Sequence, residues 1–126
     1  MAGEEMENLI LVTSDGYSGI AEYEVMLIKD TKSLNKFYSQ VNKTRKPGLP
    51  VPMLDFSKEM AIVVCLGEQK GERTPQLSQL SETEEERTIA IELSDSEKTE
   101  SYISYPFYVY KLPISSKTIN FQKVGW

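Results

Sequence analysis

The feature that most constrains the fold is a run of seven apolar residues, from Met60 to Leu66, with no equal elsewhere in the chain. The run is rich in β-branched residues and is closed by Gly67. A short apolar run of this kind predicts a strand that is buried on both faces. Because the other expected strands alternate apolar and polar residues, we expect this one to lie in the middle of a sheet, with the rest built around it.

Size and composition indicate a single globular unit over residues 1–126. A chain of 126 residues, 40% apolar and 26% charged, is long enough to bury one core without disulfides or metal. Its one cysteine, Cys65, lies inside the apolar run, so no internal disulfide can form. That absence fits a reducing compartment, and it equally fits an exported domain that does without bridges.

The N-terminal half predicts two strands and the only convincing helix. Strands are expected over residues 8–13 and 19–29, separated by a turn at Ser14, Asp15 and Gly16. A helix is expected over residues 31–42, capped by Asp30 or Thr31. Its apolar positions recur at the spacing i, i+3, i+4 and i+7, which predicts one stripe packed on the sheet; these are Leu34, Phe37, Tyr38 and Val41.

The rest of the chain predicts further strands joined by irregular segments. Residues 43–52 carry three prolines and a glycine, which exclude regular structure. Pro47 and Pro50 also have the spacing of a polyproline ligand, although a rigid loop is the better interpretation. Strands are expected over residues 75–83, 88–93, 107–112 and 118–124. The expected fold class is therefore α+β: a mostly antiparallel, curved sheet of six to seven strands, or a partly closed barrel, with one helix packed on it.

The residue types argue against most catalytic chemistry. The chain has no histidine, which excludes Ser-His-Asp and Cys-His arrangements and zinc sites that use histidine. A thiol buried in a strand has a raised pKa and is inert, so Cys65 is expected to pack rather than react. We therefore expect no enzyme, no metal and no cofactor. Two alternatives stay open, a carboxylate-based hydrolase and loose calcium binding by the acidic segments 82–86 and 95–100.

Charge is distributed unevenly along the chain, whose net charge is −5. Residues 82–100 hold eight acids and two bases, whereas residues 29–46 hold six bases and one acid. Two opposite poles suit oriented docking with a charged partner, and Lys43, Arg45 and Lys46 are the candidates on the basic side. Two solvated surfaces without a partner are the plainer interpretation. An isoelectric point near 4.8 argues against nucleic acid as the partner.

Tyrosines concentrate near the C-terminus, where residues 102–110 hold four of the seven. Tyrosine offers a large contact area at a low cost in side-chain entropy, which makes these residues candidates for partner binding. They are Tyr102, Tyr105, Tyr108 and Tyr110. If Phe107 and Val109 face the core, Tyr108 and Tyr110 stand outward on the opposite face. The alternative, which the usual packing of strand aromatics slightly favours, is that both faces are covered and these rings are core.

Several short segments resemble the PrcB C-terminal-like family, named after a non-catalytic subunit of a bacterial surface protease complex. The matching segments are Ser18-Gly19-Ile20, Ile28-Lys29-Asp30, Asp55-Phe56-Ser57-Lys58 before the apolar strand, and Tyr105 to Pro113. The resemblance implies a non-catalytic module of the bacterial cell envelope that binds another protein, with a protease as a possible partner. A different class of function, a small-ligand or glycan binder with a pocket between helix and sheet, is the alternative.

The compartment is left open by the residues themselves. No segment approaches the roughly 20 apolar residues that span a bilayer. The N-terminal residues 1–9 are acidic and lack the features of a secretory leader. We expect a periplasmic or envelope protein whose leader is missing from this chain, and a lipid anchor would be possible in that case. The alternative is a cytoplasmic protein.

Overall fold

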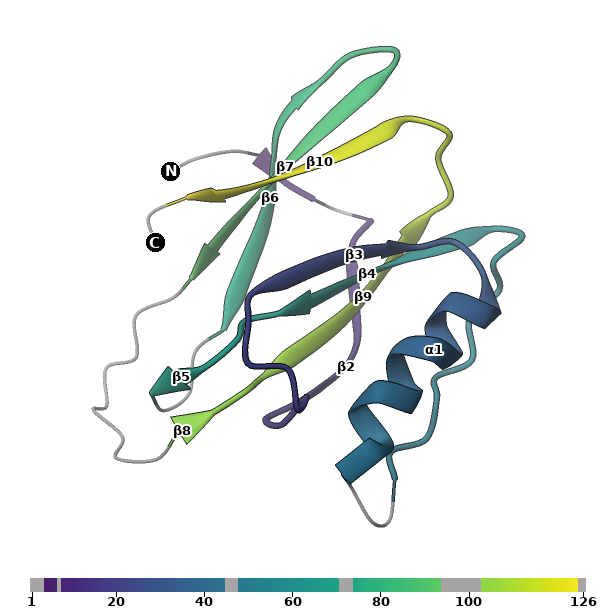
Figure 1. Cartoon of the computed structure of the whole chain (residues 1–126). Coiled ribbons are helices and arrows are strands. Elements are labelled where there is room, and N and C mark those ends of the chain that lie inside the picture. The colour runs from purple at the N-terminus through teal and green to yellow at the C-terminus, as the bar shows by residue number, and fades with distance from the viewer. Residues whose placement is uncertain (1–3, 7, 45–47, 71–73, 94–102, 125–126) are drawn as a thin grey trace.

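The computed structural model describes residues 4–6, 8–44, 48–70, 74–93 and 103–124 (Figure 1). Within these ranges the elements follow one another in this order: β1 (Glu4–Glu5), β2 (Ile10–Asp15), β3 (Glu24–Ile28), α1 (Thr31–Val41), the 3-10 helix η1 (Asn42–Thr44), β4 (Glu59–Cys65), β5 (Gln69–Lys70), β6 (Pro75–Glu82), β7 (Glu86–Leu93), β8 (Ile103–Ser104), β9 (Phe107–Pro113) and β10 (Thr118–Val124).

The strands form separate sheets. One four-stranded sheet has the order β2-β9-β4-β3, a second has the order β1-β6-β7-β10, and β5 pairs with β8 in a short ribbon. The pairs are antiparallel, except that β10 runs parallel to β7. The expected α+β class with mostly antiparallel strands is confirmed. The expected single sheet of six to seven strands is wrong, and the described strands do not close into a barrel.

The reason for the split lies in β4 and its neighbour β9, which are apolar on both faces. One helix covers only one of these faces. The other face is covered by the hairpin β6–β7, whose inward residues Leu77, Ile89 and Ile91 are buried. The hairpin has one apolar side to bury, so it stabilises the fold by lying across the first sheet rather than by extending it.

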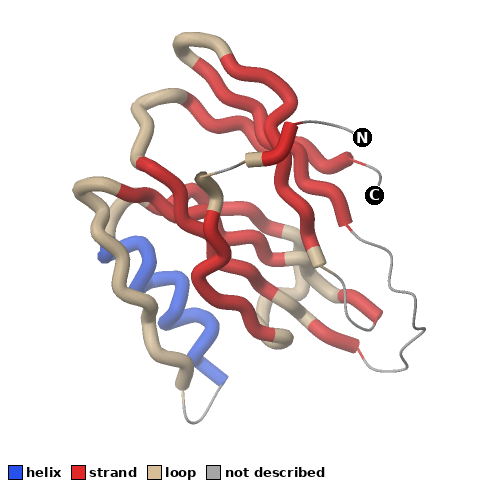
Figure 2. Tube along the Cα trace, turned by 180° about the vertical axis from the view of Figure 1, so that it is seen from behind, coloured by secondary structure: helices blue, strands red, loops and turns tan. Residues whose placement is uncertain are grey.

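The result is three layers, with α1 on one face of the β2-β9-β4-β3 sheet and the second sheet on the other (Figures 1 and 2). Alternate residues of β4 enter the two cores. Ala61, Val63 and Cys65 belong to the cluster beneath the helix, and Met60, Ile62, Val64 and Leu66 belong to the cluster between the sheets. The prediction of a central strand buried on both faces is confirmed.

Helix α1 forms where the apolar spacing predicts it. Asp30 is its N-cap, and the carboxylate accepts a hydrogen bond of 2.7 Å from the Ser33 backbone N–H. That bond lowers the pKa of Asp30, because it stabilises the charged form. The ring of Phe107 on β9 packs edge-to-face on the helix side chains Phe37 and Tyr38, with centroids 5.4 and 6.1 Å away.

The strand expected over residues 19–29 is shorter than predicted and begins at Glu24. Gly19 has a φ of 74°, which interrupts the extended backbone. From Tyr23 on, the predicted alternation holds, because Tyr23, Val25 and Leu27 all pack against the cluster between the sheets. Lys123 of β10 lies 4.1 Å from the Tyr23 ring centroid, a cation–π contact that links β10 to this side of the first sheet.

Candidate functional site

The tyrosines that the sequence singled out do not form one outward-facing surface. Tyr110 is 8% exposed and belongs to the cluster between the sheets, and burial raises the pKa of its hydroxyl. Tyr108 is half-buried against the same cluster. The outward orientation, the less favoured of the two interpretations, does not hold for Tyr110, because the second sheet covers that face of β9. The alternative, with both faces of β9 covered, is the observed arrangement.

The remaining candidates are dispersed along the chain. Tyr105 lies just before β9, beside Tyr17, and is half-buried. Lys43 is exposed in η1, after the helix. Tyr102, Arg45 and Lys46 lie outside the described residues. A role for Tyr105 and Lys43 in partner binding stays a prediction.

Among the described residues, the cysteine that could act as a nucleophile is buried, and the side chains that could bind a metal are not clustered. Cys65 is completely buried, and this burial, with a smaller effect from the charge of Glu24, raises the pKa of its thiol to about 12. In the described ranges no three histidine, cysteine or acidic side chains lie close enough together to hold a metal ion. The same part of the chain contains no helix long and apolar enough to cross a membrane.

Strand β2, at the edge of the first sheet, carries two strongly exposed apolar residues. It pairs with β9 on one side, and among the described residues no strand pairs with its other side. Ile10 and Leu11 are 54% and 50% exposed. As consecutive strand residues they point to opposite faces, since they stand opposite Lys111 and Tyr110 of β9. We call the unpaired side of β2, with Ile10 and Leu11, the β2 edge.

Comparison with the other sheet edges shows why the β2 edge stands out. Neither β3 nor β10, which also end a sheet, carries a large apolar side chain exposed to this degree along its described length. Ile103 of the two-residue strand β8 is 54% exposed, but β2 is the longer strand and carries two such residues. Most proteins protect an edge strand with charge, proline or a covering loop, because its unpaired backbone groups attract other strands. At the β2 edge a bulge between Leu11 and Thr13 gives partial protection.

A shallow hollow of about 310 Å³ lies beside Ile10. Across it, Lys111 of β9 forms an ion pair of 3.2 Å with Glu59 of β4. Its other lining residues come from the chain before β2 and from the ends of β4 and β9; they are Asn8, Lys58, Leu112 and Pro113. The hollow therefore offers an apolar contact and charged groups of both signs next to the β2 edge.

Beyond the other end of β2, two tyrosine rings meet. Tyr17 is 41% exposed, and its ring packs edge-to-face on Tyr105 with centroids 5.9 Å apart. The Tyr105 hydroxyl donates a hydrogen bond of 3.1 Å to Glu68, which raises the pKa of that hydroxyl. The rings line a small hollow of about 230 Å³ with Gly19 and Ala21. Apolar and aromatic groups thus lie at both ends of β2.

Sequence reasoning assigned no role to Ile10 and Leu11. They stand in the apolar segment Leu9 to Val12, which predicts a strand but gives no sign of its position in a sheet. A strand of consecutive apolar residues is typical of a buried position. The exposure of this one follows from the order of the strands, which depends on long-range pairing.

Comparison with known proteins gives no relative: no family model, no curated protein and no solved structure matches the chain.

Proposed function

We propose that this chain is a non-catalytic module that binds an extended segment of another protein along the β2 edge. The observation that carries the proposal is the exposure of Ile10 and Leu11 on a strand whose outer side pairs with no other described strand. A strand added there would pair with the outward backbone groups of β2, and its side chains would lie beside Ile10 on one face of the sheet and beside Leu11 on the other.

The hollow beside Ile10 supports a preference among partner segments. In strand addition, backbone hydrogen bonds give affinity and pockets for alternate side chains give specificity. The hollow could take one side chain of the added strand, which would contact Ile10 on its apolar side and the Lys111–Glu59 ion pair on its polar side. The tyrosine pair at Tyr17 and Tyr105 offers a second contact for a segment that runs the length of β2.

The resemblance to the PrcB C-terminal-like family extends the proposal to a location and a partner class. In this extended form the chain is an accessory subunit or regulator of a protease in the bacterial cell envelope. The support for this extension is the set of short segments shared with the family.

A ligand or glycan pocket between helix and sheet is less well supported. Tyr38, which would line such a pocket, is 1% exposed and packs on Phe37 and Phe107. The space beneath the middle of the helix is therefore filled by side chains. A hollow of about 330 Å³ remains at the margin between α1 and β3, where Met26 and Lys36 are among its lining residues.

The test compares capture of partners by the native chain and by an Ile10→Lys/Leu11→Lys double variant. Proteins crosslinked to the native chain in source cells are identified, and the tightest binder is purified. We expect the double variant to bind that protein at least about tenfold more weakly, since two apolar contacts are lost and two charges are introduced. Leu80→Lys, at an apolar residue on β6 that is 36% exposed, is the control for added charge and should bind normally.

Hydrogen exchange then distinguishes strand addition from a side-chain contact alone. On binding, backbone amides of β2 should exchange more slowly, because an added strand would pair with them. Equal binding by the double variant, or protection confined to another element, would contradict the proposal.

A further inference from the structure

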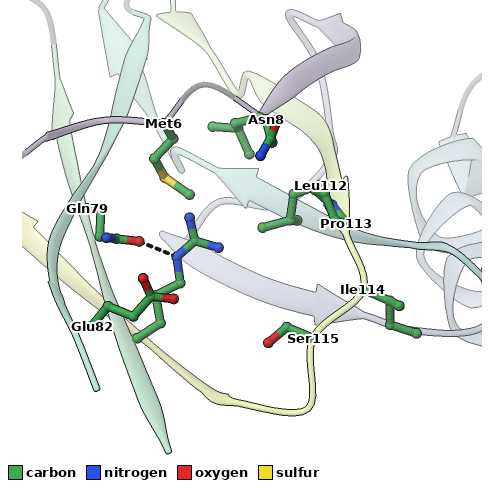
Figure 3. Close-up of a pocket in the computed structure, with 10 residues that line it drawn as sticks. Met6, Asn8, Gln79, Glu82, Leu112, Pro113, Ile114 and Ser115 are labelled. Carbon is green, nitrogen blue, oxygen red and sulfur yellow. Dashed lines mark hydrogen bonds between the residues drawn. The ribbon is translucent and has the colours of Figure 1, made fainter. Parts of the chain in front are cut away.

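A hollow of about 470 Å³ lies between the two sheets at one end of the molecule (Figure 3). Gln79 and Glu82 of β6 stand on one side, and Leu112 and Pro113 at the end of β9 stand on the other (Figure 3). Met6 also lines the hollow, on the same side as Gln79 in Figure 3. This volume falls within the range of roughly 300–1,000 Å³ that is usual for small-molecule sites.

Arg87 of β7 lines this hollow with only part of its guanidinium engaged. Its Nε donates a hydrogen bond to the Gln79 side-chain oxygen, marked by the dashed line in Figure 3. In the described part of the chain Arg87 forms no other hydrogen bond and no ion pair, although its charge attracts Glu82 and contributes to the lowered pKa of that carboxyl. Its two terminal nitrogens therefore keep their donors for a ligand, while Gln79 holds the group in place.

The acid that lines the hollow is already neutralised by another base. Glu82 accepts a hydrogen bond of 2.8 Å from the Lys117 ammonium, which lowers the pKa of Glu82 and keeps it ionised. The Lys29 ammonium reaches the same wall, where it donates to the Ser115 carbonyl over 3.0 Å. Among the residues that line the hollow, Arg87 is therefore the base and Glu82 the acid, and Lys117 pairs with that acid from outside the lining.

We propose that this hollow binds a monocarboxylate with a short apolar body. A guanidinium presents two parallel N–H donors that match a carboxylate in geometry and charge. Most of the lining surface is polar, and Met6, Leu112 and Ile114 give a short hydrocarbon part its apolar contacts. Inorganic phosphate has no hydrocarbon part to contact these apolar residues, which favours an organic monoacid.

The site includes neither Ile10 nor Leu11, so it does not depend on the function proposed above. The carboxylate could come from a free short-chain acid or from the C-terminus of a peptide, since both present the same chemistry.

The test is an NMR titration of the full chain with hexanoate, followed at the backbone amides of residues 79–87, 112, 114 and 115. We expect saturable shifts at these residues with hexanoate and none with hexanol, which has the same hydrocarbon chain without the charge. Arg87→Gln should weaken hexanoate binding by about tenfold or more, the usual effect of losing a charged hydrogen bond. Lys32→Gln, which removes one charge from the exposed face of α1, should leave it unchanged.

Two further arms identify the source of the carboxylate. The peptide Ala-Ala-Leu is titrated with a free C-terminus and with an amidated one. Binding of the free peptide alone indicates a peptide terminus, and binding of hexanoate alone indicates a free acid. Either outcome supports the site.

The proposal is overturned if neither acid produces saturable shifts at these residues, if hexanol binds as well as hexanoate, or if inorganic phosphate binds more tightly. It is also overturned if Arg87→Gln, folded by circular dichroism, binds hexanoate as the native chain does. If that variant does not fold, Gln79→Leu, which frees the guanidinium from its anchor, takes its place with the same expected loss. The comparison of hexanoate with hexanol uses only the native chain.

Discussion

Gly67 follows the central strand β4 at a point where the backbone leaves no room for a side chain. Its φ is +73°, and a Cβ atom there would lie 2.9 Å from the Tyr23 backbone nitrogen and 3.0 Å from the Glu22 carbonyl carbon. These neighbours are backbone atoms, so they cannot rotate away. We expect Gly67→Ala to lower the free energy of unfolding by about 1–3 kcal/mol, the cost of strained backbone at a non-glycine residue. Urea denaturation measures this change.

Gly16 provides the matched control. A Cβ built there meets nothing within 4 Å, and its backbone has no left-handed φ. Gly16→Ala should therefore change stability by no more than about 0.5 kcal/mol. Equal effects of the two substitutions would show that the contacts at Gly67 are not the cause.

At the scale of elements, β4 and β2 carry the same residue type in opposite environments. Ile62 of β4 is fully buried between the sheets, whereas Ile10 of β2 is 54% exposed. We expect Ile62→Ala to cost about 2–5 kcal/mol, because it removes buried contacts and leaves a cavity. Ile10→Ala should cost about 0.5 kcal/mol or less in the isolated chain. Both changes are measured by denaturant unfolding.

The comparison also bears on the role of the β2 edge. A large loss of stability in Ile10→Ala would show that Ile10 is needed for folding, and this result would contradict a role of the β2 edge as a surface for a partner.

Local sequence patterns predicted the elements that form whatever other elements pack against them. The helix and the Asp30 cap depend on spacing within about a dozen residues, and the apolar run fixes β4 through burial alone. The sequence of β9 did not decide whether one or both of its faces are buried, because Tyr108 and Tyr110 suit either a solvent-exposed or a covered face. Only the position of the second sheet decides between them. The exposure of Ile10 and the engagement of Arg87 were missed for the same reason, because both depend on packing between distant segments.

At the scale of the whole molecule, the division into two sheets depends on pairings that no local pattern contains. β10 lies parallel to β7, with Phe121 opposite Ile89, although about 30 residues separate them along the chain. β2 joins β9 across most of the sequence. The alternation of each strand shows that it has a face to bury, but it does not show which other face will cover it. The three-layer arrangement could therefore not be read from the sequence.

Because both cores share β4, we expect them to unfold together. Val63 packs beneath the helix and its neighbour Ile62 packs between the sheets, so separation of β4 from its neighbours removes both cores at once. In native-state hydrogen exchange, the slowest amides of α1, β4 and β7 should open with one common free energy, equal to that from denaturant unfolding. Amides along the unpaired side of β2 should exchange faster. Val63→Ala, which alters only the helix side, should lower protection in β7 by as much as it lowers protection in α1. Protection lost from α1 alone would show instead that the helix opens as an independent unit.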